Sequence, residues 1–239
     1  MRKNNRTQEQ LRNIIFETSF IEHPEGSCLI KMGRTWVLCT ATIEEKVPPF
    51  LDGKGQGWIT AEYSMLPRST HTRTHREAVK GKQTGRTQEI QRLIGRSLRA
   101  CLDLKKLGER SITIDCDVLQ ADGGTRIASI NGGYIALCLA VQKLMKNKKL
   151  SENPIHSTLS AVSVGMKRNE VLVDLDYDED SSCDVDMNIV MCGKDQIVEI
   201  QGTGENATFT FPQMSQMMEQ AKLAVSFIAD LQKKILSNA

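Results

Sequence analysis

Aromatic side chains are scarce in this sequence, at 5% of residues. Recognition of nucleic acid by a platform of stacked rings is therefore disfavoured, because such a platform needs several exposed rings. If the chain binds a polyanion, it must depend on charge and on backbone contacts.

Two further absences narrow the class of protein. No CxxC pair occurs among the seven cysteines, and most of them lie in apolar runs, which is typical of reduced core residues in the cytoplasm. The polar, basic N-terminus has no apolar segment, and no run approaches the roughly 20 apolar residues of a membrane helix. We expect a cytoplasmic protein with no membrane association.

The chain is long and apolar enough to bury a sizeable core. It has 239 residues, of which 40% are hydrophobic. This length permits one large domain or two fused halves.

Charge is segregated along the chain although the net charge is only +2. Between Arg68 and Arg99, nine basic residues stand against two acids, whereas Glu170 to Asp186 holds eight acids and no base. A basic segment suits a polyanion, and an acidic cluster within apolar strands suits a divalent metal ion.

Both halves of the sequence predict strands followed by a helix, and we expect the α+β class. The first half predicts a hairpin over Ser27–Met32 and Thr35–Ile43 and strands at Trp58–Met65 and Ser111–Val118. It also predicts a helix through Ile90–Leu104 with a basic stripe, and a second helix at Thr125–Lys146.

The second half shows a similar order of elements. We expect strands at Ser157–Val164, Val171–Tyr177, Met187–Met191 and Ile197–Gln201, followed by a long helix from Pro212. No residue-level repeat is visible, so the order of elements alone suggests an internal duplication.

Two segments have the residues of an anion site. Ala121 to Arg126 lies between a strand and a helix, so that two glycines, a helix N-terminus, the Thr125 hydroxyl and the Arg126 fork could surround a phosphate. A plain strand-to-helix turn with a surface arginine explains that spacing equally well. Gln83 to Thr87 offers a second glycine, arginine and threonine at a helix start, which favours the phosphate interpretation.

The segment from Met65 to Glu77 has no apolar periodicity and predicts an exposed basic loop. Such a loop could bind RNA phosphates, or it could be a solvated loop with scattered charge.

Carboxylates gather between Asp174 and Asp186. Asp184 and Asp186 are two positions apart, so in a strand their side chains would point to the same face. Asp180, in the preceding turn, could lie close to both. Converging carboxylates repel each other unless a cation compensates their charge, so we expect a bound Mg²⁺ ion.

Four motifs together closely resemble the ribonuclease PH family, and the likeness covers nearly the whole chain. They are Pro67–Thr70, Gly85–Arg99, Asp115–Arg126 and Glu179–Ser181 followed by Asp186–Asn188.

The resemblance implies a single domain of two similar halves, about 1–150 and 151–239. Each half would have a ββαβα-type fold like the second domain of ribosomal protein S5. It also implies a homohexamer built as a trimer of dimers.

The resemblance further implies a phosphorolytic 3′→5′ exoribonuclease, a phosphate-dependent nucleotidyltransferase. Such an enzyme trims the 3′ end of precursor tRNA with inorganic phosphate and releases nucleoside diphosphates. The reverse reaction adds nucleotides to RNA 3′ ends.

The same resemblance assigns roles to residues of this sequence. Inorganic phosphate is expected at Arg86, Gly124, Thr125 and Arg126. Asp180 and Asp186 are the expected catalytic and metal-binding pair, with Asp178 and Asp184 as lesser candidates. The expected RNA contacts are Arg68, Arg73, Arg76, Arg92 and Arg99.

One departure from the family pattern is Asn4-Asn5 in place of the usual Asp-Gly, and it touches no expected catalytic group. The main alternative function is a non-catalytic RNA-binding subunit of an exosome-like ring. The presence of Asp180 and Asp186 favours the enzyme.

Overall fold

The computed structural model describes residues 2, 5–205 and 207–238 of the chain. In this part it contains two β-sheets, a five-stranded one from the first half of the sequence and a four-stranded one from the second. The expected α+β class is confirmed.

The first sheet has the strand order β1-β2-β3-β5-β4. Its antiparallel part joins β1 (Ile14–Thr18), β2 (Gly26–Met32), β3 (Thr35–Glu44) and β5 (Ser111–Gln120), and β4 (Trp58–Met65) adds in parallel to β5. The β2–β3 hairpin turns at Gly33, whose φ of +57° suits a residue without Cβ. The predicted hairpin and the alternation of β5 are confirmed.

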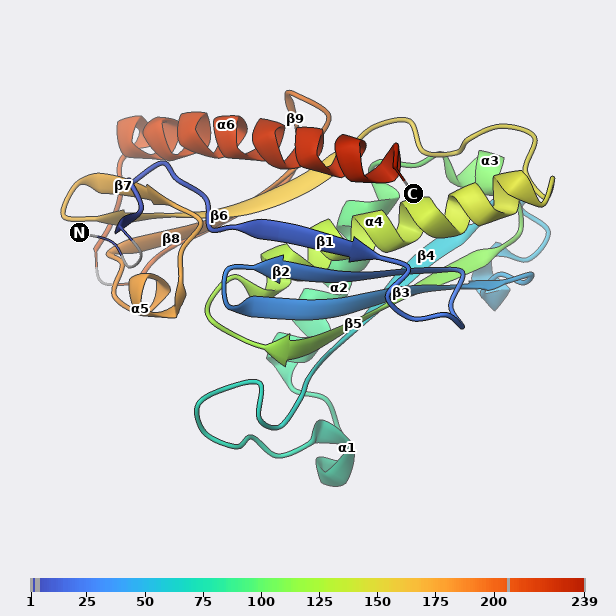
Figure 1. Ribbon diagram of the computed structural model, residues 1–239, viewed down its shortest axis with the longest axis horizontal. Helices are drawn as coiled ribbons and strands as arrows, with labels where there is room; N and C mark the ends of the chain where they lie inside the picture. Colours follow the sequence, from blue (N-terminus) through green and yellow to red (C-terminus); the bar gives the residue numbers. More distant parts are fainter. Residues whose placement is uncertain (1, 3–4, 206, 239) are drawn as a thin grey trace.

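Helix α4 (Thr125–Lys146) is buried almost all round, between the first sheet and the second. A Cβ on Gly132 would lie 2.7 Å from the Ile30 side chain, so this glycine permits close approach of the helix to β2. On the other side, Asn131 exchanges two 2.9 Å hydrogen bonds with the backbone of Ala161 in β6. The two sheets thus share one central helix (Figure 1).

By length and composition α4 could also cross a membrane. However, 83% of its most apolar window is buried inside the fold, as in the core helix of a soluble protein. The expectation that no segment approaches a membrane helix in composition is therefore too strong, and burial accounts for the apolar run.

Helix α2 (Gly85–Arg99) packs on β4. It ends five residues before the predicted Leu104, and a separate turn, α3 (Leu104–Leu107), follows. The apolar periodicity continues past Arg99 because Cys101 and Leu102 are buried in the same core after the helix has ended.

The second sheet has the order β7-β6-β8-β9, from β7 (Glu170–Val173), β6 (Leu159–Lys167), β8 (Val185–Cys192) and β9 (Gln196–Gly204). Helix α6 (Phe211–Leu236) covers one of its faces (Figure 1). The predicted strand over Val171–Tyr177 is wrong in its second part, because the chain turns at Asp174 and enters the single turn α5 (Tyr177–Asp180).

One segment departs from this compact arrangement. The loop after β4 and the short helix α1 (Glu77–Lys80) project away from both sheets (Figure 1). This is the segment that the sequence predicts to be an exposed basic loop, and the prediction is confirmed.

Candidate active site

The turn between β5 and α4 carries the first candidate anion site. Gly123 and Gly124 have φ values of +76° and +67°, and Gly124 caps α4 without a side-chain hydrogen bond. Among the described residues, no capping side chain therefore accepts from the first-turn N–H groups of α4, which can face an anion together with the positive end of the helix dipole.

The glycines of this turn also have a packing role that sequence reasoning missed. A Cβ on Gly123 would lie 2.6 Å from the backbone carbon of Asp176, and one on Gly124 would lie 3.0 Å from Nη2 of Arg12. The turn is therefore pressed against the acidic segment of the second half.

Thr125 and Arg126 begin α4 with partners from other elements. The Thr125 hydroxyl lies 2.9 Å from the hydroxyl of the buried Tyr63 on β4. The Arg126 guanidinium donates through Nη1 to Oε1 of Gln201 on β9 at 2.7 Å and to Oε1 of Glu89 on α2 at 3.3 Å. These contacts orient two candidate phosphate ligands.

The start of α2 differs from the start of α4, because the side chain of Thr84 already accepts from the Thr87 N–H at 3.2 Å. Glu77 Oε1 accepts from the hydroxyls of Thr84 at 2.7 Å and Thr87 at 2.8 Å. A carboxylate thus occupies this helix N-terminus, so Arg86 can contribute only its exposed side chain.

Arg86 and Arg126 act on the same groups across the site. Burial raises the pKa of Tyr63, and the positive charges of both arginines oppose that rise. Burial also raises the pKa of Asp180, and again both arginines oppose it. The positive charges of both candidate phosphate arginines therefore act on Tyr63 and on Asp180.

Asp180 and Asp186 are brought together from α5 and β8. Burial and then the charge of Asp180 raise the pKa of Asp186. Oδ1 of Asp186 is buried and has no hydrogen-bond partner in the described part of the chain. An unpaired buried carboxylate oxygen is costly, which is typical of a group that meets a ligand.

Asp184 does not join this pair. It precedes β8, and its Oδ2 accepts from the backbone N–H of Arg168 at 2.8 Å, in the β6–β7 turn. Within the described ranges, no three His, Cys, Asp or Glu residues are grouped closely enough to hold a metal ion. The expected meeting of three carboxylates is wrong, because Asp184 is used to close a turn.

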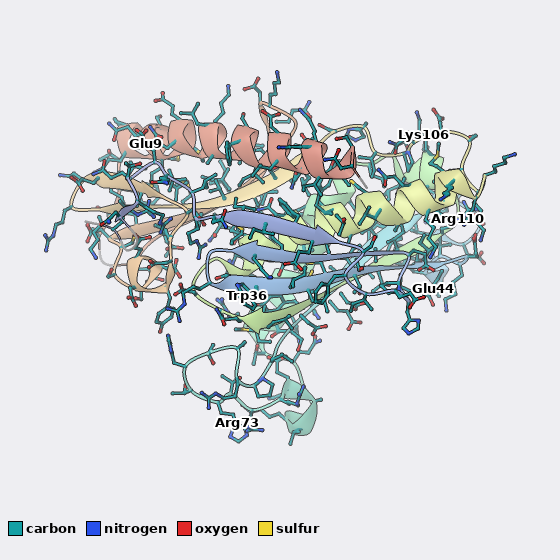
Figure 2. The ribbon with its side chains drawn as sticks, viewed as in Figure 1. Glu9, Trp36, Glu44, Arg73, Lys106 and Arg110 are labelled. Atoms are coloured by element: carbon teal, nitrogen blue, oxygen red, sulfur yellow. The ribbon has the colours of Figure 1, made fainter. Side chains whose placement is uncertain are left out.

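The candidate RNA arginines lie in two environments. Arg68, Arg73 and Arg76 are exposed on the projecting loop, and Figure 2 shows Arg73 in the part of the loop farthest from the sheets. Arg92 is exposed on α2. Arg99 instead lies 4.3 Å from the centre of the Trp58 ring and donates to the Ile59 carbonyl at 2.7 Å, so it is partly engaged within the protein.

The N-terminal segment supplies partners of the acidic segment that sequence reasoning missed. Arg2 makes a two-point ion pair with Glu179, with Nε–Oε1 and Nη2–Oε2 distances of 2.6 and 2.7 Å. Arg6 donates to the same carboxylate at 3.1 Å. The only signal in the sequence was the unexplained basic character of the first residues.

Asn5 in the same segment has a φ of +56°. Asparagine tolerates this left-handed conformation better than most residues with a Cβ, so it can stand at the place where the family pattern has glycine.

Comparisons with known proteins agree with this geometry. Residues 10–142 match the model of the 3′ exoribonuclease family, domain 1, and residues 157–224 match domain 2. The chain is 54% identical over 239 residues to ribonuclease PH of Bacillus cereus strain AH187, covering 100% of this chain and 98% of that protein. Ribonuclease PH of Bacillus anthracis strain CDC 684 gives the same values.

Solved structures share the fold at lower sequence identity. Rice Rrp46 aligns with a TM-score of 0.80 at 17% identity, covering 98% of this chain and 100% of that chain. The Archaeoglobus fulgidus exosome with RNA bound to the active site aligns with a TM-score of 0.78 at 21% identity, covering 98% and 92%.

Proposed function

This chain belongs to the 3′ exoribonuclease family. From the geometry of its candidate site we propose roles in the phosphorolysis of RNA for individual residues. The chain is a phosphorolytic 3′ exoribonuclease of the ribonuclease PH type, a phosphate-dependent nucleotidyltransferase. One observation carries the assignment of its site: the glycine turn before the uncapped N-terminus of α4 packs on Asp176 and Tyr177 at the start of α5, the helix that ends at Asp180. The charges of Arg86 and Arg126 act on Asp180.

Inorganic phosphate is proposed to bind at Arg86, Gly124, Thr125 and Arg126. The first-turn N–H groups of α4 and two guanidinium groups provide donors for its oxygens, and the Thr125 hydroxyl adds another. Tyr63 and Gln201 hold Thr125 and Arg126 in place for this role.

The reaction begins when a phosphate oxygen attacks the phosphorus of the last 3′ linkage. A new P–O–P bond forms, the bond to the 3′-oxygen of the preceding nucleotide breaks, and a nucleoside diphosphate leaves. Arg86 and Arg126 stabilise the charge on the phosphoryl oxygens. The departing 3′-oxygen takes up a proton, and Asp180 or Asp186 is the group of the site proposed to deliver it.

Asp180 and Asp186 are also the residues that would hold Mg²⁺. The buried Oδ1 of Asp186 without a partner and the mutual repulsion of the two carboxylates fit a cation. Two carboxylates suffice, because Mg²⁺ commonly completes its coordination with water and substrate phosphates. When bound, the ion would neutralise charge on the transferred phosphoryl group.

The RNA strand is proposed to follow the exposed arginines Arg68, Arg73, Arg76 and Arg92, with Arg99 at the edge of this path. Their positive charges would bind the phosphodiester backbone of RNA. Binding through charge suits a chain that has few aromatic residues to stack on bases. The proposed physiological substrate is the 3′ end of precursor tRNA. The proposed assembly is a homohexamer, a trimer of dimers, in the cytoplasm.

We also propose that the chain consists of two similar halves that divide near residue 150. The separate sheets support this division, although a single-turn α5 precedes β8 where the long α2 precedes β5. The non-catalytic ring subunit remains the weaker alternative, because such a subunit has no need of the Asp180–Asp186 pair.

The decisive experiment is to incubate 3′-extended tRNA with the purified protein with and without inorganic phosphate. Phosphate-dependent shortening with release of nucleoside diphosphates is expected, and release of monophosphates without phosphate would contradict the proposal. Asp180→Asn and Asp186→Asn should each slow shortening and diphosphate-driven extension alike, because the two directions share one transition state. Near-parental rates in both variants would move the catalytic centre elsewhere.

A further inference from the structure

Arg12 is a buried arginine that contacts two distant segments of the chain. Its side chain is 5% exposed, and that of its partner Asp174 is 0% exposed. Nη2 lies 2.6 Å from Oδ1 of Asp174, while Nε and the backbone N–H of Arg12 both donate to Oδ2, at 3.0 and 2.7 Å. This pairing satisfies both carboxylate oxygens.

The remaining branch of the same guanidinium holds the β5–α4 turn. Nη1 donates to the carbonyl oxygen of Asp122 at 2.7 Å and to that of Gly123 at 3.4 Å. The hydroxyl of Thr35 donates to the Gly123 carbonyl at 2.6 Å and accepts from the Asp122 N–H at 2.9 Å. The turn that precedes Thr125 and Arg126 is therefore fixed from two sides.

Asp174 begins the short segment that ends at Asp180, the proposed catalytic carboxylate. Its φ of +56° is unusual for a residue with a Cβ, and its backbone N–H donates to the Ser163 carbonyl at 2.7 Å. Two residues later, Asp176 and Glu179 form a capping box, and the Asp180 N–H donates to the Asp176 carbonyl at 2.8 Å. A strained residue persists only where its surroundings hold it, and such residues cluster at functional sites.

We propose that Arg12 is a positioning residue that sets the phosphate-binding turn and the Asp180-bearing segment at a fixed separation. This inference rests on the proposed function. It assigns to the N-terminal segment a part in the reaction that its sequence position, more than 100 residues from either segment, does not suggest.

The geometry requires arginine and not merely a positive charge. Arg12 uses three nitrogens of a planar fork in two directions, whereas a lysine ammonium is a single point and cannot serve both segments in the same way. Arg12→Lys therefore retains the charge beside Asp174 and weakens the link to the turn.

A second variant separates the loss of positioning from a loss of folding. Removing Arg12 alone would leave the buried Asp174 carboxylate with a single ion pair, the 3.8 Å contact of its Oδ2 with Nη1 of Arg6, which is destabilising. The double variant Arg12→Gln with Asp174→Asn removes both charges, keeps polar side chains in contact, and shortens the group that reaches the turn.

A matched control exists at the other end of the molecule (Figure 2). Arg110 also joins a carboxylate to a backbone carbonyl, with Nε donating to Glu45 at 2.7 Å and Nη1 to the Leu107 carbonyl at 3.0 Å. Arg110→Gln with Glu45→Gln removes the same two kinds of charge far from the site, from a more exposed pair.

The test measures shortening rate against inorganic phosphate concentration for the full chain, together with RNA affinity in phosphate-free buffer, Tm and oligomer size. We expect the half-saturating phosphate concentration to rise about 10- to 100-fold in both Arg12 variants, since small displacements of positioned groups have effects of this order. RNA affinity should change less than about twofold, and the Arg110 control should match the parent.

Parental phosphate dependence in either Arg12 variant would overturn the inference. Loss of the folded chain in both variants would overturn it too, because Arg12 would then serve stability alone. Failure of the proposed function is separately visible, since it would appear as phosphate-independent shortening by the parent.

Discussion

Replacing Arg126 with alanine should lower the apparent affinity for phosphate without lowering the thermal stability of the protein. The guanidinium is a charge-assisted donor toward the proposed phosphate, and such a contact contributes about 1.5–3 kcal/mol, or roughly 10- to 150-fold in affinity. The half-saturating phosphate concentration should rise within that range, and saturating phosphate should restore part of the rate.

The expected cost to stability is much smaller. Arg126 pairs with Glu89 at 3.3 Å, and the Glu89 side chain is 41% exposed, so solvent screens the pair. Exposed pairs contribute only about 0–1 kcal/mol. Gln201 loses one acceptor contact but retains its donor contacts to Glu89 and Glu199 at 3.0 and 3.1 Å. Tm should therefore stay close to the parental value.

The assay follows the initial rate of nucleoside diphosphate release against phosphate concentration, with RNA affinity and Tm measured on the same preparations. Arg110→Ala is the control, because it removes an arginine from the far end of the molecule. An unchanged half-saturating phosphate concentration for Arg126→Ala would refute the assignment and show that Arg126 holds something else. A large fall in Tm would refute the stability argument.

Three further changes test other parts of the site. Arg68, Arg73 and Arg76 changed together to alanine should weaken RNA binding and flatten its dependence on salt, as measured by titration at several salt concentrations, because fewer counterions are released. Tyr63→Phe removes the 2.9 Å contact with Thr125 and should lower stability by about 1–3 kcal/mol and raise the phosphate requirement; parental values of both would contradict it. Burial would raise the pKa of Glu77, but hydrogen bonds from threonine hydroxyls outweigh it and lower the pKa. The stabilisation from Glu77 is thus present at neutral pH and lost as the pH falls through that lowered pKa. Glu77→Gln should therefore melt below the parent at neutral pH, and this difference should vanish in acid.

Local patterns predicted most of the fold. Strict alternation located β5, and the apolar run from Thr125 to Lys146 located α4, because burial on one face or on all sides leaves a periodic trace in the sequence. The strand predicted over Val171–Tyr177 failed at Asp174. The capping pair Asp176 and Glu179 was a local signal for the start of α5 that the strand interpretation overlooked.

The sequence by itself determined the chemistry of the site, because its motifs contain the glycine turn, the two arginines and the acidic segment. Strand parity could not decide which acids meet, although the family resemblance favoured Asp180 and Asp186. Asp184 and Asp186 have the same strand parity, yet only Asp186 approaches Asp180, because Asp184 bonds to the Arg168 backbone. Nor could the sequence assign Arg12, whose partners lie 110 and 162 positions away. Contacts at such separations leave no periodic trace, and only the packing of the two sheets on α4 brings them together.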